Sequence, residues 1–225
     1  MRRRKGGAAL LLALATCSGQ LELPAARKLL QSAADEMRRV STVGFTLEVV
    51  GPLGPLAIRR AEGVLTRQGE ASAVVFLEQS GSLVEYEVVK SGGTTYVQGP
   101  TGGFQKVPSV ISNTVFDPTD LLDPSGGVAE FLTQVEGGRT EAAEAVDGTE
   151  AYRITARVRA DILEGLVPLE LGDEDVASVA WIGTEVPVVV RFRVTVRIRG
   201  ETEPTTLTVT LRDFNVPATI SPPPT

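Results

Sequence analysis

Histidine is absent from the 225-residue chain, and cysteine occurs only once. Without histidine, the commonest general base, metal ligand and neutral-pH switch are missing together. A single cysteine excludes an internal disulfide and a cysteine cluster for zinc or an iron–sulfur centre. The sequence therefore predicts no catalytic residue, no metal ligand and no cofactor, and we expect the protein not to be an enzyme.

Aromatic residues are also scarce, at 5% of the chain, so valine, leucine, isoleucine and alanine must supply most of the buried apolar surface. The formal net charge is −6. This balance disfavours nucleic acid as a partner, because phosphate binding needs a basic surface. A chain of this length can bury a large core without disulfides or metals.

The first residues have the pattern of a bacterial export signal. Residues 1–5 form a basic cluster, and the uncharged segment Gly6–Ala15 is rich in leucine and alanine. That segment is shorter than the ~20 residues of a membrane-spanning helix, which indicates a signal peptide instead. Leu14-Ala15-Thr16-Cys17 follows and resembles the lipobox of bacterial lipoproteins, with Thr16 where glycine or alanine is usual.

The lipobox resemblance implies that a diacylglyceryl group is attached to the sulfur of Cys17, with cleavage before this residue. Two or three acyl chains hold a protein firmly at a membrane, whereas one does so only marginally. The alternative is a plain secretory leader with an incidental cysteine. The expected division is a signal peptide at residues 1–16, a tether at 17–23, one domain at 24–217 and a proline-rich tail at 218–225.

Helical spacing marks two amphipathic segments, residues 24–40 and 128–135. Their apolar stripes consist of Leu29, Leu30, Ala33, Met37 and Val40 in the first and Val128, Phe131, Leu132 and Val135 in the second. Gly137-Gly138 is expected to stop the second helix. Asp117 and Pro118 have the residue types of a helix start, and a short helix with a loop is expected at 161–171.

Most of the remaining chain alternates apolar and polar residues, which predicts strands with one apolar face. Strands are expected at 42–49, 56–67, 71–79, 83–90, 94–98, 139–145, 152–158, 179–185, 188–199 and 206–212, with a short piece at 104–107. The alternation slips near Arg59-Arg60, which indicates a bulge, and it is regular through 188–199. The fold class is therefore α+β, with a single strongly curved antiparallel sheet.

An antiparallel sheet with one solvent-exposed face must bury its other, apolar face. It can do so by closing into a barrel or by packing helices over that face. The two helices are small beside the sheet, so the pattern predicts an apolar cavity between them and the sheet. The candidate lining residues are Phe45, Leu47, Val88, Tyr96, Phe131, Leu132, Ile154 and Phe192. The alternative is that these residues are ordinary packed core.

Five pieces of the chain form a recognisable series in this order: Phe116–Pro124, Gly126–Leu132, Val146–Thr149, Tyr152–Ala156 and Ala180–Ile182. This series resembles the mycobacterial and actinobacterial glycolipid-carrier lipoproteins of the LprG and LppX type (the LppX/LprA/LprF/LprG family). The resemblance covers residues 24–217. It implies a LolA/LolB-like half-barrel, with helices over the concave face of the sheet and a hydrophobic cavity that holds multi-acylated lipids or glycolipids.

The resemblance predicts a lipid carrier on the outer face of the cell membrane, anchored through Cys17, with a membrane transporter as a candidate partner. Two alternatives stay open, a non-transporting binding or sensor module of the same fold and a lipid-ester hydrolase. Arginines recur on the outward strand faces, at Arg153, Arg157, Arg159, Arg191, Arg193, Arg197 and Arg199. They either meet anionic head groups or form a solvated face that protects the sheet.

Overall fold

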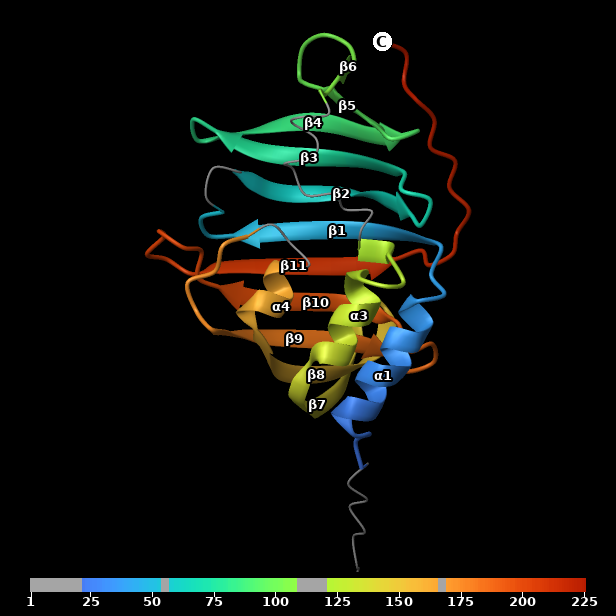
Figure 1. Ribbon diagram of the computed structural model, residues 1–225, viewed down its shortest axis with the longest axis vertical. Helices are drawn as coiled ribbons and strands as arrows, with labels where there is room; N and C mark the ends of the chain where they lie inside the picture. Colours follow the sequence, from blue (N-terminus) through green and yellow to red (C-terminus); the bar gives the residue numbers. More distant parts are fainter. Residues whose placement is uncertain (1–21, 54–56, 109–120, 166–168) are drawn as a thin grey trace, which may run out of the picture.

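One antiparallel sheet dominates the computed structural model, which describes residues 22–53, 57–108, 121–165 and 169–225 (Figure 1). Within these residues the sheet has eleven strands, in the spatial order β6-β5-β4-β3-β2-β1-β11-β10-β9-β8-β7. The strands are β1 (Thr42–Val50), β2 (Ile58–Thr66), β3 (Ala71–Gln79), β4 (Ser82–Ser91), β5 (Thr94–Gln98), β6 (Gln105–Lys106), β7 (Glu136–Val146), β8 (Thr149–Arg159), β9 (Asp175–Gly183), β10 (Val189–Val196) and β11 (Thr205–Arg212).

The helices α1 (Ala26–Met37), α3 (Gly127–Gln134) and α4 (Ala160–Glu164) all lie on one face of this sheet. They cover β7–β11, which we call the covered half, and α1 contacts β7 and β9 while α4 contacts β8. Strands β2–β6, which we call the wing, extend beyond the helices (Figure 1). Strand β1 joins the two parts because it pairs with β2 on one side and with β11 on the other.

Most residues of the helical stripes predicted from spacing are buried, whereas Leu29, Val128 and Val135 are only half-buried. Leu30, Ala33 and Met37 of α1 are at most 4% exposed, and Phe131 and Leu132 of α3 are at most 5% exposed. Each stripe faces the sheet because residues three and four apart share one side of a helix. Helix α1 begins at Ala26, two residues after Pro24, so Pro24 precedes the helix and is not in its first turn.

Two strand irregularities test the predicted alternation. The slip near Arg59-Arg60 is confirmed, since the pairing of β2 with β3 shifts between Ile58 and Arg60. The regular alternation through 188–199 is wrong, because the pairing of β10 with β9 shifts between Val189 and Arg191. A bulge inserts one unpaired residue, so the residues before it point to the opposite side from the one that strict alternation predicts. Val189, which pairs with Ile182, therefore points to the helix-covered face in place of Val188 and Val190.

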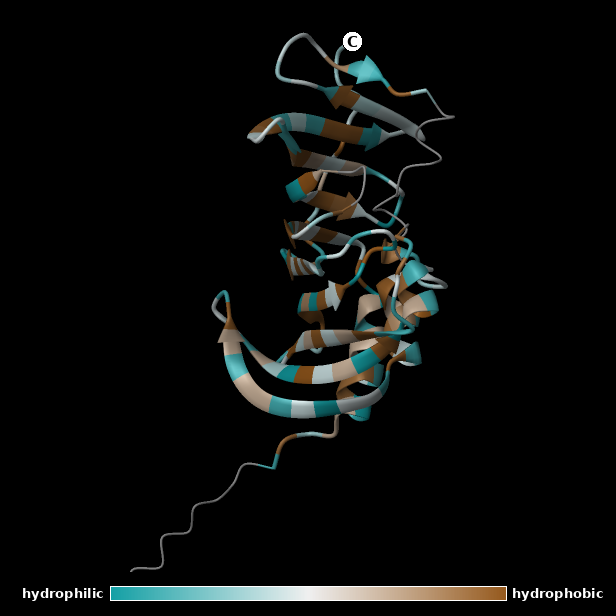
Figure 2. Cartoon of the chain, turned by 90° about the vertical axis from the view of Figure 1, so that its left-hand side faces the viewer, coloured by the Kyte–Doolittle hydropathy of each residue, from teal (hydrophilic) through white to brown (hydrophobic). Residues whose placement is uncertain are grey.

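The strand predicted at 139–145 is longer than expected. It begins at Glu136 and includes Gly137 and Gly138. The prediction that these glycines stop the second helix is wrong, because α3 already ends at Gln134. Gly137 has a φ of 65°, which favours glycine. Strands β7 and β8, the two lowest in Figure 2, are strongly bent. The predicted helix start at Asp117 and Pro118 lies outside the described residues.

Two sets of polar contacts link the parts of the sheet. The Arg67 guanidinium, just after β2, donates to the backbone oxygens of Arg38 and Val40 at the end of α1. The C-terminal segment forms no strand, but Thr42 Oγ1 donates to the Val216 oxygen at 2.7 Å, and Ser91 Oγ donates to the Ile220 oxygen at 3.3 Å. This segment therefore runs from the end of β11 to the wing. No helix among the described residues is long and apolar enough to span a membrane.

Candidate functional site

A row of paired residues crosses nine strands on the face that the helices cover. Directly paired residues in an antiparallel sheet point to the same side. The row consists of Thr140, Ile154, Ala180, Phe192, Val209, Leu47, Ala61, Val75 and Tyr86, each paired with the next. Every member except Thr140 has an apolar body, so this row forms an apolar path from the covered half into the wing. We call it the apolar row.

A second row lies beside the first and extends further into the wing. It consists of Leu211, Phe45, Gly63, Ala73, Val88 and Val97, each paired with the next. Gly63 has no room for a side chain, because a Cβ there would lie 2.1 Å from the Ser72 backbone oxygen. The two rows together bring five of the sequence-predicted residues onto one face, namely Phe45, Leu47, Val88, Ile154 and Phe192.

Helix α3 brings two more of the predicted residues over this face. The ring of Phe131 meets the ring of Phe192 edge to face, with centroids 5.3 Å apart and an angle of 83° between the planes. Such a contact adds to the energy of area burial. Leu132 is 2% exposed within the same core. Phe131 and Leu132 therefore belong to the packed layer between α3 and the covered half.

Burial changes along the apolar row. Along this row Ile154 and Ala180 are 1% and 6% exposed, whereas Phe192 and Val209 of the covered half are already half-buried. Beyond them Ala61 is 6% exposed, and Leu47, Val75 and Tyr86 are half-buried. In the second row Phe45 is 9% exposed and Val88 is half-buried. Along this row the apolar face is thus sealed at β8 and β9 and partly open from β10 into the wing.

Tyr96 does not share this face. It pairs with Val89, while its neighbour Val97 pairs with Val88 in the second row. Successive residues of a strand point to opposite sides, so Tyr96 and Val89 lie on the face away from the helices. The prediction that Tyr96 lines the helix-covered side is therefore wrong, and Val97 occupies that side.

The opposite face of the sheet is polar along its corresponding row. That row consists of Arg153, Trp181, Arg191, Thr210, Thr46, Glu62, Val74 and Glu87, each paired with the next. Arg191 and Arg193 stack over the Trp181 ring at 6.0 and 5.5 Å from its centroid, and Trp181 Nε1 donates to Glu144 at 2.6 Å. These arginines cover a buried indole, which favours a structural role for them over a free head-group site.

Other predicted arginines on this face also have acidic partners. Arg153 lies 3.5 Å from Glu144, and Arg199 lies 3.6 Å from Glu170. Asp161 raises the pKa of the Arg159 guanidinium above its usual value, first through a side-chain hydrogen bond. Glu62 raises the pKa of Arg60 on β2 by the same cause. The guanidinium groups of Arg159 and Arg60 therefore stay charged at any ordinary pH.

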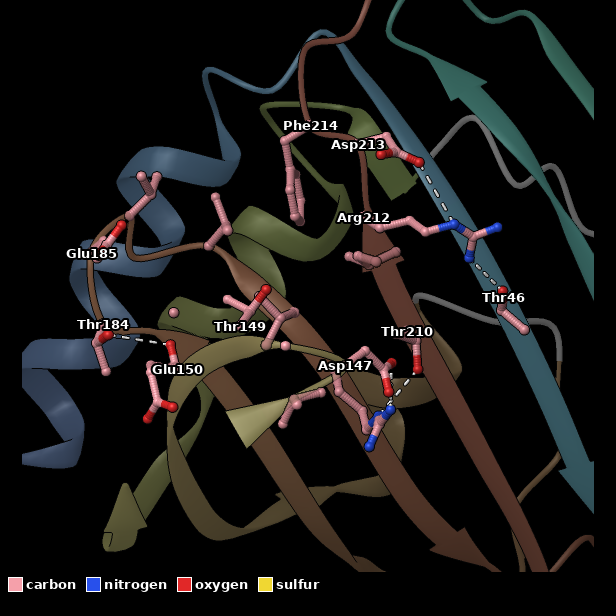
Figure 3. A pocket seen from close by; sticks show the side chains of 18 of the residues that line it. Thr46, Asp147, Thr149, Glu150, Thr184, Glu185, Thr210, Arg212, Asp213 and Phe214 are labelled. Atoms are coloured by element: carbon pink, nitrogen blue, oxygen red, sulfur yellow. Dashed lines mark hydrogen bonds and ion pairs between the residues drawn. The ribbon is translucent and has the colours of Figure 1, made fainter. Parts of the chain in front are cut away.

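A cavity of about 770 Å³ lies at one end of the strands, and Leu211 is the one residue of the two rows that lines it (Figure 3). Its walls are the β7–β8 hairpin tip, the β9–β10 connection, the start of β10, the end of β11 and the outward side of β1. Polar members of the lining are Thr46, Glu48, Asp147, Thr149, Glu150, Thr184, Glu185, Arg191, Thr210, Arg212 and Asp213, and apolar members are Val146, Val186, Val188, Val190, Leu211 and Phe214.

Hydrogen bonds fix several of these polar side chains. Arg191 bridges Asp147 at 2.7 Å and Thr210 at 3.1 Å, which holds the hairpin tip against β10 and β11. Arg212 donates to Thr46 Oγ1 at 2.6 Å (Figure 3). The local sequence pattern predicted no site at Asp147, because the lining comes from segments far apart in the chain. No group of acidic, histidine or cysteine residues among the described residues could hold a metal ion.

Comparison with known proteins places the fold in context. The family model described as LppX_LprAFG lipoprotein matches residues 25–220. The lipoarabinomannan carrier protein LprG of Mycolicibacterium smegmatis is 25% identical over 93% of this chain and 90% of its own. The LprG of Mycolicibacterium hassiacum is 29% identical over 93% of this chain and 91% of its own.

Solved structures have the same architecture. The crystal structure of LprF from Mycobacterium bovis matches with a TM-score of 0.72 and 21% identity, covering 88% of this chain and 96% of that one. The structure of LppX from Mycobacterium tuberculosis matches with a TM-score of 0.62 and 16% identity, covering 87% of this chain and 98% of that one. At these identities the likeness shows the fold.

Proposed function

Because this chain belongs to the LppX_LprAFG lipoprotein family, we propose that it binds multi-acylated lipids or glycolipids on the apolar face of its sheet and carries them across the cell envelope. The LprG relatives bear the name lipoarabinomannan carrier protein, which supports a glycolipid as the ligand. In this proposal Cys17 is acylated and anchors the protein on the outer face of the membrane, with a membrane transporter as the partner that loads or unloads it.

The observation that carries the proposal is the change of burial along the apolar row. Val75 and Tyr86 of the wing stay half-buried, although they continue the same row as Ile154 under the helices. Contiguous exposed apolar surface marks a binding site more often than chance exposure does. An acyl chain laid along the wing would cover these side chains.

The energetic gain from such a surface is large. Exposing a sixteen-carbon acyl chain to water costs roughly 12 kcal/mol, at ~0.8 kcal/mol per methylene group. An apolar face that follows the chain removes most of this cost and needs no catalytic group. The proposed lining is Phe45, Leu47, Val88 and Phe192, joined by Ala61 and Val75, with Phe131, Leu132 and Ile154 forming the closed end.

The test is mass spectrometry of lipid that copurifies with a Cys17→Ser variant of the full chain from an actinobacterial host. This substitution removes the chain's own acyl groups from the measurement. We expect acyl lipid bound to the protein. Protein that purifies free of lipid, and takes up none from vesicles, would contradict the proposal.

A matched pair of substitutions on β3 locates the lipid. Val75→Asn places an amide in the apolar row, and a buried amide without partners costs about 1–3 kcal/mol. We expect at least about tenfold less bound lipid for this variant. Val74→Asn is the control, because Val74 is also half-buried but lies on the opposite face between Glu62 and Glu87. Equal loss in both variants would place the lipid elsewhere.

Lipid transfer between donor and acceptor vesicles separates a carrier from a binding or sensor module. A carrier speeds the transfer of a fluorescent acyl lipid in proportion to protein concentration. Binding without any acceleration would favour the non-transporting module. Release of free fatty acid during the assay would instead indicate ester hydrolysis.

A further inference from the structure

The cavity at the strand ends differs in chemistry from the apolar face. Five carboxylates and two guanidinium groups in its lining give a formal charge of −3, and four threonines add hydroxyl groups. Its volume of about 770 Å³ falls in the range of small-molecule sites, roughly 300–1,000 Å³. The cavity is therefore large enough for a ligand, and its walls restrict what that ligand can be.

Three ligand classes fit the lining poorly. A phosphate or a fatty-acid carboxylate would meet an excess of negative charge. A hydrocarbon chain would have to desolvate charged side chains. A metal ion lacks a ligand set, since the described residues contain no suitable group of donors.

A ligand made of hydroxyl groups matches the lining well. Carboxylates only accept hydrogen bonds and guanidinium groups only donate them, whereas a hydroxyl does both. The bonds of Arg191 to Asp147 and Thr210, and of Arg212 to Thr46, hold these groups in place before any ligand arrives. Preorganised polar groups lower the cost of binding.

The apolar side chains of the lining can pack against the C–H faces of a sugar ring. Phe214 is half-buried, and Val188 and Val190 of the lining are 6% and 5% exposed. Sugar rings carry C–H faces as well as hydroxyls, so they can pack on such side chains while their hydroxyls reach the rim. We propose that this cavity binds a neutral oligosaccharide.

The inference stands on the cavity and does not require a lipid on the apolar face. The glycan has two sources with the same chemistry, the head group of a bound glycolipid or a free glycan of the cell envelope. Apart from Leu211, the cavity lining shares no residue with the two rows, so substitutions can address each separately.

The experiment titrates the Cys17→Ser full chain with the neutral trisaccharides mannotriose and maltotriose, followed by NMR chemical shifts. We expect at least one of them to bind and to shift signals of Thr46, Thr184 and Phe214. Arg212→Met removes a donor of the lining, and Glu150→Ala removes an exposed acceptor of the lining. Each variant should weaken binding at least about fivefold, the loss expected for one hydrogen bond.

Arg60→Met is the matched control. Arg60 and Arg212 both have side chains 49% exposed and both lie on the face away from the helices, but Arg60 is outside the cavity. The control should bind the trisaccharide as the parent does. Absence of binding by the parent, equal binding by Arg212→Met and Glu150→Ala, or tighter binding of inorganic phosphate or of triarginine would overturn the inference.

Two further arms separate the sources and the two proposals. If Arg212→Met lowers retention of a glycolipid but not of the matching diacylglycerol, the site holds a glycolipid head group. If Arg212→Met retains the glycolipid and the diacylglycerol as well as the parent does but binds the trisaccharide more weakly, the site holds a free glycan. Either of these two results supports an oligosaccharide site in the cavity. Val75→Asn should lower lipid retention without changing trisaccharide binding, so failure of the lipid proposal leaves the oligosaccharide result intact.

Discussion

The covered half and the wing have the same alternating sequence pattern, yet their apolar faces differ in burial. In the covered half Ile182, Val158 and Ile154 are at most 1% exposed, because α1, α3 and α4 pack over this part of the sheet. In the wing Val75 and Val88 point to the same side and remain half-buried. Alternation thus sets the side to which a residue points, and the helices decide whether it is sealed.

Because of this difference in burial, the apolar residues of the covered half mainly stabilise the fold, and those of the wing are available to a ligand. Each side chain that is fully removed from water adds about 1.5–3 kcal/mol to folding, and a half-exposed one adds less. The covered half therefore supplies most of the folding energy. The wing retains apolar area that a ligand can still bury, so a ligand on the wing adds stability by mass action.

The largest expected effect comes from shortening one residue in each part. Ile154→Ala should lower the free energy of unfolding by about 3–4 kcal/mol, because it leaves a cavity in a packed core. Val75→Ala should lower it by about 1 kcal/mol or less, since part of its side chain is already in water. Urea unfolding of lipid-free protein measures both, and equal losses would remove the distinction between the two parts.

The link between the parts should give an intermediate effect. Arg67→Met removes the guanidinium that holds the backbone oxygens of Arg38 and Val40, so the end of α1 loses its attachment to β2. Charge-assisted bonds of this kind contribute about 1.5–3 kcal/mol. We expect a loss of about 2 kcal/mol in urea unfolding, with faster amide exchange at the end of α1.

A surface guanidinium on β2, the strand that Arg67 follows, serves as the control for Arg67. Arg60→Met removes an exposed pair with Glu62, and such pairs contribute little. Its unfolding midpoint should stay within experimental error. If Arg67→Met and Arg60→Met behaved alike, the contact of Arg67 with α1 would not join the two parts.

The smallest expected effect concerns the C-terminal segment that runs from β11 to the wing. Thr42→Val removes the 2.7 Å bond to the Val216 oxygen, at a cost of about 1 kcal/mol. Amide exchange in residues 214–220 should become faster, while exchange in β7–β9 stays unchanged. Thr195→Val is the control, because the Thr195 hydroxyl contacts the hydroxyl of Thr206 and not the C-terminal segment. If Thr195→Val also made exchange in residues 214–220 faster, the segment would not be held by Thr42.

Much of the fold could be predicted from local spacing. The two main helices and most of the strands lie where their apolar periods place them, and the irregularity at Arg59-Arg60 is present. Tyr96 was assigned to the wrong face because both Tyr96 and Val97 are apolar, so alternation in this short strand does not indicate which one faces the helices. The bulge before Arg191 was missed because the valines at 188–190 satisfy either register.

The cavity was beyond sequence reasoning. Asp147 and Arg191 are 44 residues apart, and Thr46 and Arg212 are 166 residues apart, yet each pair is hydrogen-bonded. In the sequence, each of these four residues has the pattern of a solvent-exposed polar residue in an ordinary strand or turn. Only the bend of the β7–β8 hairpin and the pairing of β1 with β11 bring them together.

The sequence by itself determined the two faces of the sheet and the apolar stripes of the helices, because side-chain direction follows from a backbone period of two or 3.6 residues. The tertiary structure decided which strands are neighbours, which half the helices seal and where the polar lining converges. Backbone hydrogen bonds between strands are the same for every side chain, so strand order depends on the packing of the whole chain and leaves no local signal.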